Sequence, residues 1–389
     1  MGKQTISSDS FETWGIFGTH GVWTLEVGVE LYVADNPAVW LNGNARGNTI
    51  NILGDIINTG ADAIGIAVFG SRNRFFVGED ASITAQYGIS GPGTHTEVDN
   101  RGTISATLMG LAFDGPTEIR NSGMISAIIG VMVDNGSSVV NTSSGRIVGF
   151  DVGVVFDAGV NRLVNNGAIA GGTYSLVNDG RRATIINNGR LDGDVLLGIG
   201  SDYFDTRNGT INGRVFGSLG DDTFVLSNAR TRIVEYGGEG TDTVESTASY
   251  TLGNNLNRLI LLGNADLDGS GNALPNVLQG NAGDNLIHGM AGVDTLSGGL
   301  GTDRQRGGTG ADTFVFNKGD QTEIVMDYID EIDTIAILDT RFSSFRGLSR
   351  HIEDHGADTW ILLGGDDRIV LKGVDHSVLE RTDFEFTTL

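Results

Sequence analysis

Acidic and amide side chains recur every nine residues between positions 271 and 315, always at the same place in a glycine-rich unit. The units read GNALPNVLQ, GNAGDNLIH, GMAGVDTLS, GGLGTDRQR and GGTGADTFV. Position 6 is Asn276, Asn285, Asp294, Asp303 and Asp312. Position 8 is apolar except at Gln305. Oxygen ligands in a flexible turn suit Ca²⁺ and suit Zn²⁺ or Cu²⁺ poorly. The spacing therefore predicts sites for a hard divalent cation.

Glycine at positions 1, 2 and 4 permits backbone angles closed to other residues, so we expect these turns to point carbonyl oxygens inward. The carbonyls predicted to contribute belong to Gly289, Gly292, Gly298, Gly299, Gly301, Gly307, Gly308 and Gly310. Successive units should lie on opposite edges, which places Asn276, Asp294 and Asp312 on one edge and Asn285 and Asp303 on the other. We expect the best site between Asp294 and Asp312, and weaker sites where asparagine removes a charge.

Looser relatives of the unit lie upstream in LGIGSDYFD, GSLGDDTFV and GGEGTDTVE. Their aspartates, Asp202, Asp222 and Asp242, are spaced at 20 residues. They are further candidate metal ligands, but ordinary solvated turns explain them equally well, because the half-coils between them lack the motif.

A second, longer repeat must position these turns. Glycines of an N-x-G landmark recur about every 21 residues, at Gly60, Gly102, Gly123, Gly145, Gly167, Gly189 and Gly209, with a degenerate copy at Ala81 between the first two. Short runs of Ile, Val, Leu, Phe and Ala lie between them, bounded by Asn and Gly, as is typical of strands and turns. Coils of this kind predict an all-β chain, a parallel β-solenoid or β-helix that runs continuously into a β-roll. The crossover rule predicts a right-handed path.

The repeats divide the chain into five predicted segments. Residues 1–45, with three of the four tryptophans, are expected to cap the solenoid. Residues 46–195 form the β-helix, 196–262 the transitional coils, and 263–316 the β-roll. Residues 317–389 form a small C-terminal cap with one helix near 343–355.

Composition excludes several classes of function. The net charge is −24 and only three lysines are present, so nucleic acid is not an expected partner. The absence of cysteine excludes disulfides and thiolate metal sites. No apolar run is long enough for a membrane helix. The start, MGKQTISSDSFETWG, lacks the apolar core of a Sec-type signal.

Candidate catalytic patterns are weak. His351 and His355 flank Glu353, but a metalloprotease helix requires H-E-x-x-H. Neither a G-x-S-x-G elbow nor a P-loop occurs. The asparagine column could form a sugar-binding stripe, although a ladder of stacked amides is favoured. Its members are Asn58, Asn100, Asn121, Asn141, Asn165, Asn187 and Asn208. We therefore expect no enzyme, with a β-helix polysaccharide lyase or epimerase as the alternative.

The stretch from Thr251 to Phe316 resembles the repeats-in-toxin (RTX) family of haemolysin-type calcium-binding proteins, whose signature is G-G-x-G-x-D-x-U-x. DTIAILD, RIVLKGV and LERTDFEF are similar to the family's uncleaved C-terminal signal for type I secretion. The resemblance implies bound Ca²⁺, secretion of the unfolded chain and folding outside the cell. We expect an extracellular or cell-surface protein with a structural, adhesive or self-assembling role, whose partners are calcium, the secretion machinery, and further copies of itself or a surface polysaccharide.

Overall fold

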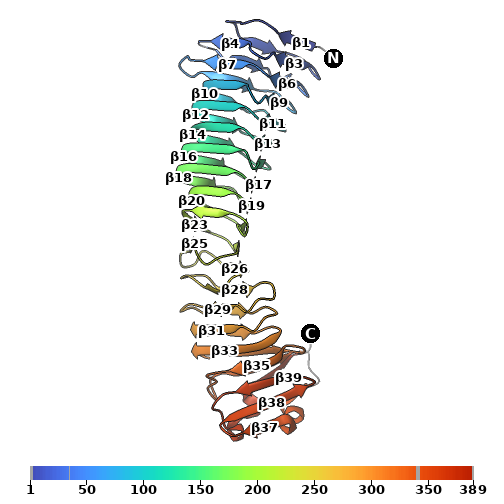
Figure 1. Ribbon diagram of the computed structural model, residues 1–389, viewed down its shortest axis with the longest axis vertical. Helices are drawn as coiled ribbons and strands as arrows, with labels where there is room; N and C mark the ends of the chain where they lie inside the picture. The colour runs from blue at the N-terminus through green and yellow to red at the C-terminus, as the bar shows by residue number, and fades with distance from the viewer. Residues whose placement is uncertain (1–2, 35, 339–341, 388–389) are drawn as a thin grey trace. The chain divides into compact units, whose positions relative to one another are not determined.

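A computed structural model describes residues 3–34, 36–338 and 342–387. The chain divides into two compact units, one ending at Gly220 and the other beginning at Asp221. Both units are built from short parallel strands stacked in successive coils (Figure 1). The predicted all-β parallel solenoid is therefore confirmed.

Two columns of parallel strands build the N-terminal unit. The first column contains, in order, β1 (Lys3–Ile6), β3 (Val22–Leu25), β6 (Thr49–Ile52), β9 (Arg74–Val77), β11 (Thr96–Asn100), β13 (Thr117–Asn121), β15 (Ser138–Asn141), β17 (Val160–Asn165), β19 (Arg182–Asn187) and β21 (Tyr203–Asp205). The second contains β2 (Trp14–Ile16), β5 (Val39–Leu41), β8 (Ile64–Val68), β10 (Ser82–Gly91), β12 (Thr103–Phe113), β14 (Met124–Val133), β16 (Arg146–Phe156), β18 (Ala168–Asn178), β20 (Arg190–Leu196), β22 (Thr210–Asn212) and β23 (Arg214–Phe216). β4 (Glu30–Val33) pairs with β7 (Asp55–Asn58), which pairs with β10.

Each coil of this unit buries the alternate apolar residues of its strands. In the coil around β12 and β13, Ile104, Leu111 and Ile119 are buried. Glycines at one corner allow neighbouring coils to approach closely. A Cβ on Gly88 would lie 2.4 Å from the carbonyl oxygen of Gly110, and one on Gly110 would lie 2.5 Å from that of Gly130. The corner glycines thus recur because a side chain there would collide with the next coil.

Buried asparagines connect the turns of successive coils. The Nδ2 of Asn100, Asn121, Asn141 and Asn165 each donates to the Oδ1 of the next asparagine, over 2.7 to 2.9 Å. The predicted amide ladder is confirmed from Asn100 to Asn187. It is wrong at its ends, which are described next.

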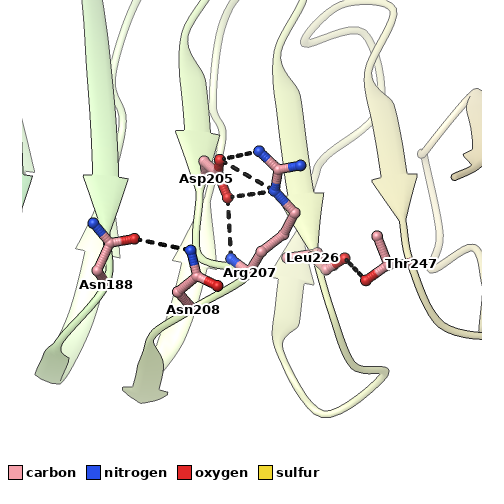
Figure 2. A network of polar contacts seen from close by, with 6 residues as sticks. All are labelled: Asn188, Asp205, Arg207, Asn208, Leu226 and Thr247. Atoms are coloured by element: carbon pink, nitrogen blue, oxygen red, sulfur yellow. Dashed lines mark hydrogen bonds and ion pairs between the residues drawn. The ribbon is translucent and has the colours of Figure 1, made fainter. Parts of the chain in front are cut away.

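At the C-terminal end of the ladder, Asn187 donates to the Oγ1 of Thr206 instead of to Asn208. Asn208 belongs to an exposed outer ladder, in which it donates to Asn188 over 3.3 Å (Figure 2). Beside it, Arg207 forms an ion pair with Asp205. At the other end, Asn58 donates to the carbonyl of Ile64.

The C-terminal unit also has two columns. The first contains β24 (Thr223–Leu226), β26 (Thr243–Ser246), β28 (Arg258–Leu261), β30 (Val277–Gln279), β32 (Thr295–Ser297), β34 (Thr313–Asn317), β36 (Thr334–Leu338) and β40 (Phe384–Thr387). The second contains β27 (Tyr250–Thr251), β29 (Asp268–Ser270), β31 (Leu286–Ala291), β33 (Gly301–Thr309), β35 (Gln321–Val325) and β39 (Asp367–Leu371). β25 (Arg232–Val234) lies between β24 and β26 in sequence.

The core of this roll is formed by position 8 of the nonapeptides. Leu278, Leu296 and Phe314 stack from the first column, and Ile287 lies in the second. Gln305 occupies the same buried place as Ile287 in the following coil. The polar departure at position 8 is therefore inside the core and not at the surface.

The two ends of the chain are built differently from each other. Strand β1 pairs in parallel with β3, and β3 with β6, so this part of the N-terminal segment forms coils of the solenoid. Near the C-terminus, the predicted helix over 343–355 is reduced to α1 (Phe345–Leu348) and the 3₁₀ turn η1 (Ser349–His351). β37 (Ile352–His355) then pairs antiparallel with β38 (Asp358–Gly364), which pairs with β39. The turns η2 (His376–Val378) and η3 (Arg381–Asp383) precede β40.

Candidate metal sites

The position-6 side chains on one edge of the roll form a column that hydrogen-bonds from coil to coil. The Oδ1 of Asp294 accepts from the backbone N–H of Asn276 over 2.8 Å, and the Oδ1 of Asp312 accepts from that of Asp294 over 2.9 Å. Each step spans 18 residues. Asn276, Asp294 and Asp312 thus lie together on one edge, as the alternation of the units predicts.

The buried Asp294 carboxylate lacks a hydrogen-bond donor for one of its two oxygens. Its Oδ2 is buried and receives no hydrogen bond from the part of the chain that the structure describes. Burial raises the pKa of Asp294 to about 6, with the Asn276 N–H opposing the rise and the Asp312 charge adding to it. Burial likewise raises the pKa of Asp312. A cation at this edge would compensate both carboxylates.

The position-1 glycines leave room beside these carboxylates. A Cβ on Gly289 would lie 2.5 Å from the Oδ2 of Asp294 and 2.6 Å from the carbonyl oxygen of Gly307. A Cβ on Gly307 would lie 2.3 Å from the Oδ2 of Asp312. Carboxylate and carbonyl oxygens therefore lie close to the same small spaces. This all-oxygen set fits a hard cation such as Ca²⁺.

The predicted reason for glycine, a backbone angle closed to other residues, holds at positions 2 and 4 of the last three units but not at position 1. In the last three units, the glycines at positions 2 and 4 have positive φ: Gly292 (129°), Gly299 (98°), Gly301 (123°), Gly308 (102°) and Gly310 (144°). Gly289, Gly298 and Gly307 at position 1 have no positive φ, and there glycine is required because a Cβ would occupy the space next to the carboxylate. Met290, at a position 2, adopts φ 84°, which strains a residue with a side chain.

The second edge repeats the arrangement. The Oδ1 of Asp303 accepts from the backbone N–H of Asn285 over 2.6 Å. Burial raises the pKa of Asp303 to about 6, and the charge of Asp284 adds to the rise. Burial and the neighbouring charge of Asp303 hold the pKa of Glu323 well above its usual value. Glu323 is a residue that the sequence pattern did not predict.

The column of position-6 side chains on the first edge also extends beyond the nonapeptides. The Oδ1 of Asp333 accepts from the backbone N–H of Asp312 over 2.9 Å, so Asp333 continues this column. Sequence reasoning missed it because no glycine-rich turn precedes it. A signal was nevertheless present, since Asp-Thr recurs at 222–223, 242–243, 294–295, 312–313 and 333–334. Their threonines align in register within β24 and β26, and within β32, β34 and β36.

Upstream in the same unit, a third carboxylate joins two of the predicted aspartates. Asp222, Glu235 and Asp242 are buried, and one oxygen from each lies within 4.8 Å of the others. The backbone N–H of Asp222 donates to the Oδ1 of Asp242 over 2.9 Å, and burial raises the pKa of Asp242 to about 6. Glu235 follows β25 outside any glycine motif, so the sequence pattern could not identify it.

Asp202 lies in the N-terminal unit. Its Oδ1 accepts from the backbone N–H of Ala183, and burial raises its pKa to about 7. It therefore has the same coil-to-coil hydrogen bond as the aspartates of the roll, in a coil that carries the looser motif.

The two histidines that flank Glu353 lie in separate environments. His351 ends η1 and contacts the ring of Phe342, whereas His355 ends β37 and stacks on Trp360 at 4.0 Å. Glu353 lies 3.4 Å from the Nε2 of His355. The pattern is split between a 3₁₀ turn and a strand instead of occupying one face of a helix.

Comparison with known proteins supports a calcium site in the roll. Residues 270–305 match the family model of the RTX calcium-binding nonapeptide repeat, in four copies. The chain therefore carries the RTX repeat, a calcium-binding motif, in the segment that contains Asp294 and Asp303.

Other comparisons are more distant. No curated protein matches the chain. Among solved structures, the extracellular lipase LipA from Serratia marcescens aligns with 16% identity and a TM-score of 0.22. That alignment covers 59% of this chain and 44% of the lipase chain. Within the described residues, no helix has the length and apolar character needed to cross a membrane.

Proposed function

We propose that this protein is a secreted calcium-binding β-solenoid whose C-terminal unit completes its folding when calcium binds outside the cell. The observation that supports the proposal most directly is the column of Asp294 and Asp312 in consecutive coils of one edge. Both carboxylates are buried, and the Oδ2 of Asp294 lacks a donor among the described residues. Buried carboxylates are tolerated when they are paired or bind a metal.

The proposed ligands follow from the two edges. On the first edge, an ion would be held by Asp294 and Asp312 together with the carbonyls of Gly289 and Gly307. On the second edge, Asp303 would be a ligand. Asn276 and Asn285 supply weaker, neutral oxygens. The turn carbonyls of Gly292, Gly298, Gly299, Gly301, Gly308 and Gly310 are further proposed ligands. Upstream, Asp222 and Asp242 with Glu235, and separately Asp202, are proposed as additional ligands.

Calcium would couple secretion to folding. Without an ion, the stacked carboxylates repel one another, whereas with one the binding free energy stabilises the fold. Extracellular calcium modules bind at about 10⁻⁴ to 10⁻³ M, well above cytosolic calcium concentrations. The C-terminal unit would then stay loosely folded inside the cell, which suits export by a type I secretion system.

A calcium-binding assay on the full chain tests the proposal. We expect Asp294→Asn/Asp312→Asn to bind fewer calcium ions per chain in equilibrium dialysis, because the double substitution removes both charges of the first edge. Asp366→Asn is the matched control, since Asp366 is exposed in the same unit. Unchanged binding in the double variant, or no binding by the natural chain in millimolar calcium, would contradict the proposal.

For the extracellular role, we propose structure or adhesion in place of catalysis. Support comes from the N-terminal unit, where the exposed amides of Asn166, Asn188 and Asn208 line one ladder and Phe150 is 67% exposed. Negative-stain microscopy should show particles that associate in millimolar calcium and disperse in chelator. Unsaturated uronate released from an acidic polysaccharide would instead establish the lyase alternative.

A further inference from the structure

Three polar side chains lie inside the last coils of the roll, where an apolar core is expected. Asp303 and Gln305 on β33 and Glu323 on β35 are 0%, 0% and 1% exposed. β33 and β35 are paired in parallel, with Asp303 opposite Glu323. Gln305 occupies position 8, which is apolar in the other four units. The three side chains therefore form one buried polar cluster.

Hydrogen bonds satisfy only part of this cluster. The Nε2 of Gln305 donates to the Oε2 of Glu323 over 2.8 Å, and the Oδ1 of Asp303 accepts from the N–H of Asn285. The remaining oxygens, Asp303 Oδ2, Gln305 Oε1 and Glu323 Oε1, are buried and accept no hydrogen bond from any described residue. Leaving such a group unsatisfied in the interior destabilises the fold, and a charged group does so more strongly.

The backbone of Gly298 lies close to both carboxylates. A Cβ on Gly298 would lie 2.5 Å from the Oε2 of Glu323 and 2.6 Å from the Oδ2 of Asp303. Within the described part of the chain, neither carboxylate forms an ion pair with a Lys, Arg or His side chain. The cluster thus holds two acidic groups without a basic partner, beside a position that only glycine leaves open.

A single proton would not satisfy all three buried oxygens, and a cation is the better candidate. One proton shared by Asp303 and Glu323 would leave the Oε1 of Gln305 unsatisfied, because the Gln305 amide already donates to Glu323. A cation bound among the three oxygens would satisfy them and compensate both charges. Carboxylate and amide oxygens without nitrogen or sulfur ligands favour Ca²⁺.

We propose that Asp303, Gln305 and Glu323 form a calcium site within the core of the roll, with side-chain ligands supplied by strands instead of turns. This site deepens the proposed function and rests on it. β35 pairs with β33 on one side and with β39 on the other. Binding at Glu323 would therefore make attachment of the C-terminal β37–β38–β39 sheet to the roll depend on calcium.

The test compares the natural chain with Glu323→Gln. Calcium is measured by equilibrium dialysis, and hydrogen exchange is followed in peptides covering 321–325 and 367–371. We expect Glu323→Gln to bind one ion fewer, or to bind that ion at least about tenfold more weakly. In calcium its β35 and β39 peptides should exchange faster than those of the natural chain. In chelator they should be protected at least as well, because an uncompensated buried charge has been removed.

Two further variants make the result decisive. Gln305→Leu restores the apolar residue of the other units and should also weaken the ion at least about tenfold. It decides the question if Glu323→Gln does not fold. Glu385→Gln is the control, since Glu385 is exposed on β40 and should leave binding unchanged.

The outcomes separate this proposal from the proposed function. If the natural chain binds no calcium, both fail. If Asp294→Asn/Asp312→Asn loses an ion while Glu323→Gln and Gln305→Leu match the natural chain in stoichiometry and affinity, only the core site is overturned. That result would assign the cluster to a shared proton or a buried water.

Discussion

At the residue scale, Asp294 and Asp303 satisfy one carboxylate oxygen within the fold and leave the other without a hydrogen-bond donor among the described residues. In Asp294, Oδ1 accepts a hydrogen bond from the neighbouring coil, while Oδ2 is buried beside the space that Gly289 leaves open. The same division holds for Asp303. The hydrogen bond fixes the carboxylate in place, so an ion would meet a preorganised ligand.

The raised pKa values predict opposite effects of acid with and without calcium. Burial raises the pKa of Asp294 and of Asp242 to about 6 in the folded chain, above the usual value of 3.8. In chelator, their protonation favours the folded state below pH 4, and this stabilisation is lost as the pH rises through 6. Lowering the pH from 7.5 to 5 should therefore raise the urea midpoint of the C-terminal unit.

In millimolar calcium the same acidification should lower that midpoint, because protons compete with the ion for the carboxylates. Circular dichroism during urea unfolding measures both cases. A midpoint that moves in the same direction in calcium and in chelator would contradict the assignment of these aspartates as ligands.

Single residues show how far the sequence could predict the site. Asp294, Asp303 and Asp312 were identifiable because the nine-residue period places them in register. Glu323, which lies beside Asp303, and Glu235, which lies beside Asp222 and Asp242, were not identifiable. Both belong to segments outside the nine-residue period. Asp333 was identifiable in principle from its Asp-Thr dipeptide, although the absence of a glycine turn concealed it.

At the scale of elements, the two units join their coils with different chemistry. Buried amides connect the strands of the N-terminal unit, and Asn121, Asn141 and Asn165 each both donate to and accept from a neighbouring asparagine. In the roll, buried aspartates directly before the strands of the first column accept instead from backbone N–H groups of the neighbouring coil. Neutral amides satisfy one another without an ion, whereas adjacent carboxylates repel.

A substitution in the amide ladder should therefore act without regard to calcium. Asn141→Ala removes a buried side chain whose Nδ2 donates to Asn165 and whose Oδ1 accepts from Asn121. The partners left unsatisfied should cost about 1–3 kcal/mol each. Asn188→Ala, in the exposed ladder, should change stability by less than about 0.5 kcal/mol.

Urea unfolding followed by circular dichroism, in calcium and in chelator, compares these two variants. Equal effects of Asn141→Ala and Asn188→Ala, or a loss confined to calcium-containing buffer, would refute the role assigned to the amide ladder.

The strands were largely predictable because glycine and asparagine punctuate short apolar runs. The segment near 343–355 was not, because its second half pairs antiparallel across a tight turn. Gly356 adopts φ 82°, and its N–H donates to the Oδ1 of Asp354 over 2.9 Å. This turn reverses the chain into β38, where a helix was expected.

At the scale of the whole molecule, most of the excess negative charge lies in the C-terminal half of the chain, where calcium is proposed to bind. Residues 201–389 contribute −16 of the net charge of −24. The amide ladder lies in the unit that ends at Gly220, and the RTX repeats lie in the unit that begins at Asp221. Removal of calcium should therefore destabilise one unit and spare the other.

Hydrogen exchange of the full chain, in millimolar calcium and in chelator, tests this central claim most directly. We predict that chelation removes protection from peptides within 221–338 and 342–387, while peptides within 96–187 keep theirs. Equal protection of the C-terminal unit under both conditions would contradict calcium-dependent folding.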